Sequence, residues 1–176
     1  MRYIENEDQK VLLAWIVAGL GINRDGDNLK GNTSYLFNNM IAKYTLFSPN
    51  YNISENAFTY MKENHDFDPE RTYKRYKFYG KSSGLIYEHP VPALVIRKRL
   101  FEFDNPSPEK VRDVLQASGQ VTVLIRDEDK GLSDEKLSRK MPDDWEWEDN
   151  EPYARYKKVG IEISDVLLKV DGAVYR

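Results

Sequence analysis

The segment DQKVLLAWIVAGL, residues 8–20, would be apolar around almost its whole circumference as a helix. Apolar residues recur there at helical spacing at Val11, Ala14, Trp15 and Ala18, and more apolar residues lie between them. Such a helix is stable only when other elements cover most of its surface. It is also shorter than the roughly 20 apolar residues that span a bilayer. The sequence therefore predicts a largely buried helix in the core of a globular protein.

Composition indicates the size and class of that protein. The chain of 176 residues is long enough for one sizeable core, so we expect residues 1–176 to form a single domain. It contains no cysteine, which excludes disulfides, thiolate metal sites and cysteine nucleophiles. The charged N-terminus MRYIENEDQK is unlike a signal peptide. These features predict a cytoplasmic protein without a membrane partner.

The order of helix and strand patterns predicts the fold class. Spacing and start signals indicate helices from Thr33, from Ser54 as an N-cap, after Pro92 and after Ser107. Short strands are indicated at residues 85–87, at QVTVLI (residues 120–125), and in VGIEI and VLLKV near the C-terminus. We therefore expect an α+β fold with a helical N-terminal half and short β-strands in the C-terminal half.

Basic and aromatic residues are concentrated in RTYKRYKFYGK, residues 71–81, which we call the basic run. It holds five basic residues, four aromatic residues and no acid. Lysine and arginine neutralise phosphates and rings stack on bases, so this composition suits nucleic acid. The candidate nucleic-acid contacts are Arg71, Lys74, Arg75 and Lys77, extended by Arg97 and Lys98 on the helix after Pro92. The alternative is an edge strand guarded by lysines, with tyrosines packed inward.

A second charged segment, PDDWEWEDNE at residues 142–151, is the acidic loop. It holds six acids and no base, and Trp145 and Trp147 lie among them. An acidic-aromatic loop of this kind is typical of a contact surface for a protein partner, or of a compact loop packed on its own domain. It could also pair with the basic run within the same chain, or be neutralised by the nearby Arg155.

The segment YEHPVP, residues 87–92, contains one of the two histidines of the chain. An unperturbed histidine titrates near pH 6.5, so His89 is a candidate general base and Glu88 could orient it or bind a metal. The alternative is a strand-end histidine with one structural hydrogen bond. The other histidine, His65, could join Asp66 and Asp68 at a metal, but a helix end followed by an Asx-type turn is the favoured interpretation.

YEHPVPALVI resembles the first motif of the HNH, or ββα-metal, nucleases, and VTVLIRDEDKGL resembles the strand and helix of their second half. The resemblance implies that His89 activates water and that Glu88 and Asp129 hold a divalent metal ion, Mg²⁺ or a similar ion. It also implies a degenerate ββα-metal element within the fold. The motif is short, and no histidine follows residue 89 where the family has a second metal ligand.

Together these features predict a metal-dependent endonuclease that acts on nucleic-acid phosphodiesters, or a degenerate relative of one. The alternative is a non-enzymatic regulator, of phage or defence-system type, that binds nucleic acid or protein. Cleavage of nucleic acid that depends on His89 would separate the two.

Overall fold

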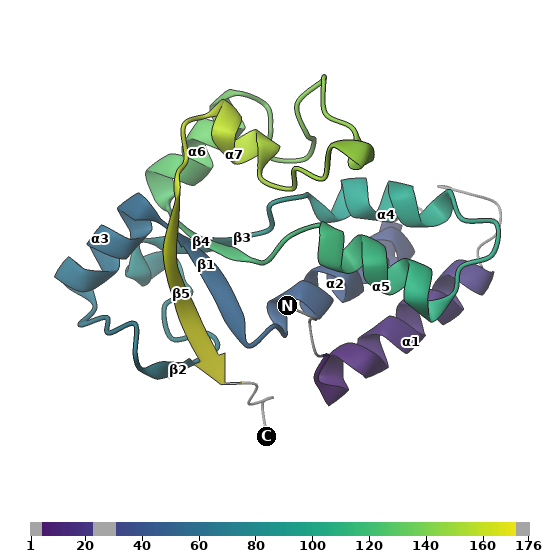
Figure 1. The fold of residues 1–176 in the computed structure, drawn as a ribbon, viewed down its shortest axis with the longest axis horizontal. Coiled ribbons are helices and arrows are strands. Elements are labelled where there is room, and N and C mark those ends of the chain that lie inside the picture. The colour runs from purple at the N-terminus through teal and green to yellow at the C-terminus, as the bar shows by residue number, and fades with distance from the viewer. Residues whose placement is uncertain (1–4, 23–30, 172–176) are drawn as a thin grey trace.

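Figure 1 shows the computed structural model of the chain, which describes residues 5–22 and 31–171. A curved sheet with three helices lies on one side of the molecule, and the other described α-helices gather on the opposite side. The sheet side carries α3 (Glu55–Asn64), α6 (Arg126–Asp134) and α7 (Ala154–Lys158). The helical side consists of α1 (Glu7–Ile22), α2 (Gly31–Leu46), α4 (Ala93–Phe101) and α5 (Pro108–Ala117).

The sheet is mixed, and in the described residues its strand order is β2-β5-β1-β4-β3. The strands are β1 (Asn50–Ser54), β2 (Thr72–Lys74), β3 (Leu85–Glu88), β4 (Thr122–Ile125) and β5 (Ile163–Asp171). The central strand β1 runs parallel to β4 and antiparallel to β5, while β2 is parallel to β5. The outer strand β3 is antiparallel to β4, with Leu85 opposite Ile125 and Glu88 opposite Thr122.

Two helices begin at the serines that the sequence indicates. The hydroxyl of Ser54 accepts a hydrogen bond of 3.0 Å from the amide of Ala57 at the start of α3. At α5 the Ser107 hydroxyl accepts from the amide of Lys110, and Pro108 occupies the first turn. Each hydroxyl supplies an acceptor for an amide that has no partner inside its helix, which confirms both predicted start points.

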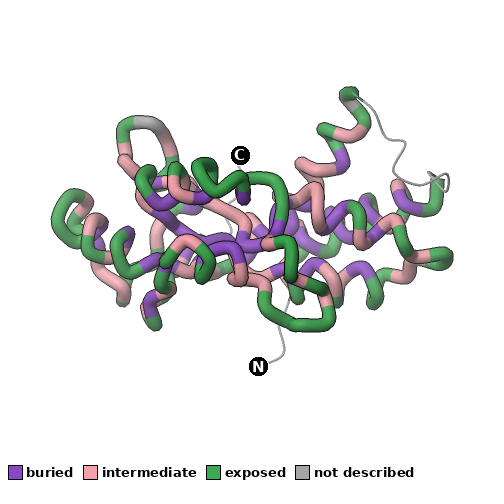
Figure 2. The backbone as a smooth tube through the Cα atoms, turned by 90° about the horizontal axis from the view of Figure 1, so that it is seen from above, coloured by how far each residue is buried: buried purple, intermediate pink, exposed green. Residues whose placement is uncertain are grey.

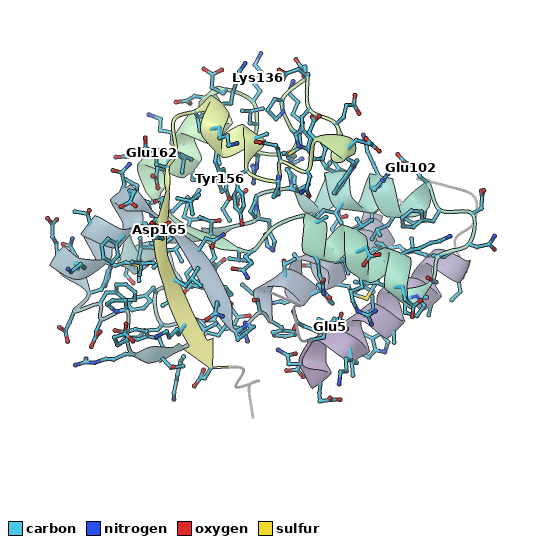
Figure 3. The ribbon with its side chains drawn as sticks, viewed as in Figure 1. Glu5, Glu102, Lys136, Tyr156, Glu162 and Asp165 are labelled. Atoms are coloured by element: carbon cyan, nitrogen blue, oxygen red, sulfur yellow. The ribbon has the colours of Figure 1, made fainter. Side chains whose placement is uncertain are left out.

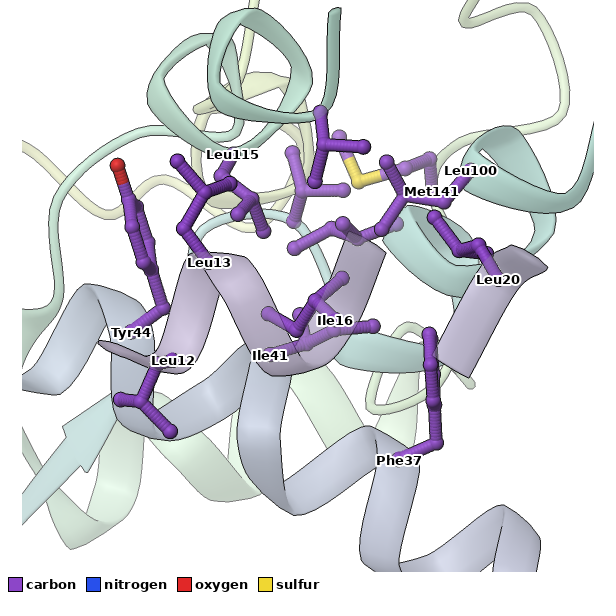
Figure 4. Packing of buried hydrophobic residues seen from close by; sticks show 13 residues of the cluster. Leu12, Leu13, Ile16, Leu20, Phe37, Ile41, Tyr44, Leu100, Leu115 and Met141 are labelled. Atoms are coloured by element: carbon purple, nitrogen blue, oxygen red, sulfur yellow. The ribbon is translucent and has the colours of Figure 1, made fainter. Parts of the chain in front are cut away.

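A hydrophobic core joins the helices of the helical side (Figure 4). Its buried members from α1 and α2 are Leu12, Leu13, Ile16, Leu20, Phe37, Ile41 and Tyr44. From α4, α5 and the segment before the acidic loop come Ile96, Leu100, Val111, Leu115 and Met141. The N-terminal segment is fastened to this core because Glu5, labelled in Figure 3, pairs with Arg112 of α5 at 2.8 Å.

Two more clusters fill the sheet side. One lies between α3 and the strands and includes Tyr51, Ile53, Met61 and Phe78. The other lies under α6 and α7, where Tyr156 is fully buried (Figure 3). In Figure 2 the buried stretches accordingly follow the strands and the inner sides of the helices, while loops and helix ends are exposed.

The expected α+β class is confirmed, but the strands are interleaved with helices through the chain instead of following a helical half. The sequence analysis missed β1, whose residues NYNIS include two asparagines and show no strong strand propensity. Tyr51 and Ile53 are nevertheless fully buried, so packing outweighs propensity there. Of the two strands expected near the C-terminus, VLLKV lies within β5, which passes through Ser164 and Asp165, whereas only Ile163 of VGIEI belongs to a strand.

The first helix is also less buried than predicted. Leu12, Leu13, Ile16 and Leu20 face the core, but Trp15 is 60% exposed and Val11 is 49% exposed. One side of α1 is thus apolar and open. None of the helices within residues 5–22 and 31–171 combines the length and hydropathy required to cross a bilayer.

Candidate functional site

A pocket of about 510 Å³ opens between α2, α4 and the segment that precedes the acidic loop. Its walls come from α2, from the end of β3 and the start of α4, and from residues 138–139. The lining residues are Gly31, Ser34, Tyr35, Asn38, Glu88, His89, Pro92, Ala93, Leu94, Arg97, Ser138 and Arg139. The structure therefore brings together three of the residues singled out in the sequence, Glu88, His89 and Arg97.

The start of α4 faces this pocket without a cap. Pro92 precedes the helix and has no side-chain hydrogen bond to offer, and the first amides of the helix belong to Ala93 and Leu94. Neither amide has an acceptor among the described residues. Free amides and the helix dipole together make a helix N-terminus attractive to an anion.

Two arginines add positive charge to the pocket. Arg97 lies one turn after Ala93 on the same side of α4, and its guanidinium donates to the hydroxyl of Ser34 on α2. Arg139 is exposed at the rim and forms no ion pair or side-chain hydrogen bond with the residues that the structure describes. Its guanidinium is thus available to a ligand.

His89 is half-buried at the wall of the pocket, and its Nε2 lies 3.1 Å from the carbonyl oxygen of Ala42 on α2. A carbonyl only accepts, so Nε2 carries the proton and the neutral ring has its lone pair on Nδ1. Burial lowers the pKa of His89 below its usual value, and the positive charges of Arg155 and Lys43 act in the same direction. Nδ1 has no hydrogen-bond partner among the described residues, so it can accept a proton.

Glu88 does not stand free beside His89. Its carboxylate forms an ion pair with the guanidinium of Arg155, which is fully buried on α7. The same guanidinium donates to the carbonyls of His89, of Pro90 at 2.7 Å and of Leu137 at 2.8 Å. Arg155 therefore fixes the chain on both sides of the pocket and balances the charge of Glu88, the carboxylate that the described residues contribute to the pocket lining. It does not neutralise the acidic loop, as the sequence analysis had considered.

The proposed metal ligand Asp129 lies away from this pocket. It is on α6, which follows Ile125 directly, and Ile125 pairs with Leu85 at the opposite end of β3 from His89. At about 3.3 Å per residue, β3 separates its two ends by about 10 Å. The buried acid of α6 is instead Glu128, which accepts hydrogen bonds from Ser54 at 2.7 Å, Asn56 at 3.1 Å and the amide of Ile125 at 3.0 Å.

The described residues therefore do not fit the metal that the nuclease resemblance implies. They contain no group of three or more histidines and carboxylates that could hold a metal ion. His65 caps the end of α3, and its Nε2 lies 2.8 Å from the carbonyl of Ser83. Asp68 accepts from the amide of Glu70, as in an Asx turn. The divalent ion stays a prediction of the sequence.

The basic run does not present its charges on one surface. Arg75 is buried, and its guanidinium donates to the carbonyl of Ser48 at 3.0 Å and to the hydroxyl of Tyr51 at 2.8 Å. Arg71 is paired with Asp68 at 3.3 Å. Lys74 and Lys77 are exposed, as is Lys98 on α4, which does not line the pocket. The run thus combines a structural arginine with exposed lysines.

The acidic loop packs on its own neighbourhood. Trp145 and Trp147 are half-buried against the helical core, with ring centroids 5.0 Å apart. Its ion pairs join Glu148 to Arg99 at 3.3 Å, Asp143 to Lys140 at 2.7 Å, and Glu151 to Lys157. None of the ion pairs in the described part of the chain joins the acidic loop to the basic run. A second pocket, of about 620 Å³, lies beside Trp145.

No family model, curated protein or solved structure matches this chain. The geometry of the site is accordingly the basis for its function. Sequence reasoning missed Ser34, Asn38 and Arg139, because they reach the pocket from segments far from His89 in the chain. An uncapped helix start after Pro92 was the one local signal that could have found the anion-attracting amides.

Proposed function

We propose that this protein binds nucleic acid and holds a backbone phosphate in the pocket between α2 and α4. The observation that carries the proposal is the convergence of the uncapped N-terminus of α4 with two arginines, Arg97 and Arg139. Amides at a helix start and guanidinium groups are the donors that proteins use for phosphate oxygens. Hydroxyls of Ser34 and Ser138 line the same pocket and can donate as well.

The carboxylate in the pocket does not oppose this function. Glu88 would repel a phosphate if its charge were uncompensated, but Arg155 pairs with it from the buried side. His89 is held neutral by burial and so adds no repulsion either. The positive charge of Arg139 remains for a ligand, because this side chain is exposed and has no partner among the described residues.

The experiment is a binding titration with labelled nucleic acid at several salt concentrations. Arg139→Ala removes a side chain that has no partner among the described residues, so it should weaken binding and lower the salt slope by about 1 without changing the thermal melt. Lys98→Ala is the matched control, because it removes an equal charge from α4 outside the pocket. Equal losses for both variants would reject the pocket as the phosphate site.

Ala93→Asp gives a sharper test. A carboxylate in the first turn of α4 interacts favourably with the free amides and the helix dipole, so the variant should melt at a higher temperature. The same carboxylate occupies the place of the phosphate and should abolish binding. Improved stability with undiminished binding would contradict the proposal.

A second candidate function, phosphodiester hydrolysis, is favoured by one observation. His89 lines the pocket that would hold the phosphate, and it is a neutral imidazole whose Nδ1 has no hydrogen-bond partner among the described residues. It could take a proton from water as a general base.

Hydrolysis is tested by incubating plasmid and RNA with the protein in Mg²⁺, Mn²⁺, Ni²⁺ or Zn²⁺ and in EDTA. Cleavage that is lost in His89→Gln supports hydrolysis, and no cleavage in any condition leaves the binding function alone.

A further inference from the structure

Lys43 of α2 lies against Tyr76, and Tyr79 of the same turn is exposed. Ser34 and Asn38 line the pocket from the first half of α2, and Ala42, one turn further on, holds His89. Lys43 follows at once and donates to the hydroxyl of Tyr76 at 3.0 Å. We call Lys43, Tyr76 and Tyr79 the tyrosine face.

We propose that the ligand of this protein is single-stranded nucleic acid, with one phosphate in the pocket and the base of a neighbouring nucleotide stacked on Tyr79. This inference rests on the proposed function and specifies its substrate class. Its basis is the position and exposure of the tyrosine face.

Tyr79 has the properties of a stacking platform. Its side chain is 59% exposed, although most large aromatic residues of the sheet side are covered. The ring is supported from within the protein by Tyr87, with centroids 5.5 Å apart, and by Tyr76, with centroids 6.0 Å apart. A ring that is fixed by its neighbours and still open to solvent can receive a base with little loss of side-chain entropy.

Lys43 supplies a positive charge next to the ring of Tyr76, which supports Tyr79. Its ammonium group lies 5.4 Å from the centroid of Tyr76 and is tied to that residue's hydroxyl. The pocket and the tyrosine face are connected through α2, because Lys43 follows Ala42, whose carbonyl oxygen lies 3.1 Å from Nε2 of His89 at the pocket wall. A cation beside the stacking position is placed to neutralise the phosphate that links two nucleotides.

The distance between Tyr87 and His89 matches the step between neighbouring nucleotides of one nucleic-acid strand. Tyr79 packs on Tyr87, and His89 follows Tyr87 by two residues, which is about 7 Å of extended backbone. Neighbouring nucleotides of an extended single strand can span such a step.

A duplex cannot use this surface in the same way. Paired bases stack on one another and present only their edges, whereas an unpaired base has an open face for an aromatic ring. The pocket alone would accept a phosphate from either form. The tyrosine face is therefore the feature that selects the single strand.

The test compares a labelled short oligothymidylate with a DNA hairpin duplex of similar length, by fluorescence anisotropy at fixed salt. The wild-type protein should bind the oligothymidylate more tightly. Tyr79→Ala should weaken that binding by about 5- to 150-fold, the range expected for one lost stacking contact, and leave the hairpin affinity unchanged. Tyr79→Phe keeps the ring and should bind like wild type. Tyr79→Leu, which keeps packing on Tyr87 but has no flat ring, should behave like Tyr79→Ala even if the alanine variant folds poorly.

Trp15→Ala is the control, because Trp15 is exposed to the same extent, at 60%, but lies on α1 away from the pocket. If Arg139→Ala weakens binding while Tyr79→Ala and Tyr79→Leu do not, the inference is overturned and the phosphate pocket stands. Equal losses on oligothymidylate and hairpin would also overturn it. If the wild-type protein binds neither probe, the proposed function fails and this inference fails with it.

Discussion

Arg155 at the start of α7 is fully buried and forms an ion pair with the half-buried Glu88 at the end of β3, although the two residues are 67 positions apart in the chain. The pair has a structural and an electrostatic consequence. Structurally, the guanidinium joins the β3–α4 connection to the segment around Leu137. Electrostatically, it compensates the Glu88 carboxylate, so that this carboxylate does not cancel the positive charge of Arg139 in the pocket.

Replacing Arg155 with alanine should strongly destabilise the protein. The change leaves the Glu88 carboxylate and the carbonyls of His89, Pro90 and Leu137 without their donor. Loss of one partner from a buried pair costs about 3–5 kcal/mol, which urea unfolding would measure. Glu88→Gln keeps an acceptor for Arg155 and should cost less. A loss under about 1 kcal/mol in Arg155→Ala would show that the guanidinium is not the link described here.

The sequence predicts the parts of this site that depend on neighbouring residues. Ser107-Pro108 and Ser54 indicate helix starts because a cap acts within one turn. Glu88, His89 and Arg97 come from one short stretch, and the pocket contains all three. Arg155 gave no such signal. Its partners lie on β3 and on the segment before the acidic loop, and only the folded chain brings them together.

The same reasoning explains where the sequence analysis went wrong. A helical pattern reports which residues are apolar but not which side is covered, so Trp15 was expected inside and lies outside. The strand β1 was missed because its asparagines have low strand propensity, although Tyr51 and Ile53 alternate with them and are buried. In a run of acidic residues such as RDEDK, the sequence does not indicate which carboxylate is buried. The structure selects Glu128, and the predicted ligand Asp129 stays at the half-exposed surface.

Glu128→Gln should destabilise the connection between β4, α3 and α6. One carboxylate oxygen accepts from Ser54 and from the amide of Ile125, and the other accepts from the amide group of Asn56. Glutamine has a single acceptor oxygen, so its own NH₂ must face one of these donors. We expect a loss of about 1–3 kcal/mol in the free energy of unfolding. Asp129→Asn, one residue along the same helix, is the control and should change stability little.

Gly84→Ala should also be destabilising, because this glycine precedes β3 with φ of +75°. A methyl group there would overlap the Tyr60 side chain and lie 2.8 Å from its Cζ atom. Alanine is unfavourable in left-handed backbone, and its methyl group would also clash with Tyr60. Both effects destabilise the folded state, so the melting temperature should fall. Gly131→Ala is the matched control. It lies in α6 with nothing within 4 Å of the added Cβ, and alanine should raise stability by about 0.5–1 kcal/mol. Similar falls in both variants would contradict this account of Gly84.

The lowered pKa of His89 predicts a specific dependence of stability on pH. The pKa of His89 is lowered in the folded protein, mainly by burial, so the unfolded chain binds a proton more readily than the folded one. The stabilising contribution is therefore fully present above the unfolded pKa of about 6.5 and is lost as the pH falls below it.

His89→Gln can still donate to the Ala42 carbonyl but cannot titrate. The free energy of unfolding of wild type should fall relative to this variant below about pH 6.5, by at most about 1.4 kcal/mol for each pH unit. Urea unfolding of both proteins between about pH 5 and pH 8 would measure this difference. His65 and the carboxylates are common to both proteins and cancel in the comparison. Parallel curves over the whole range would mean that the ring is equally accessible to protons in the folded and unfolded states, and that it does not seal against α2 as described.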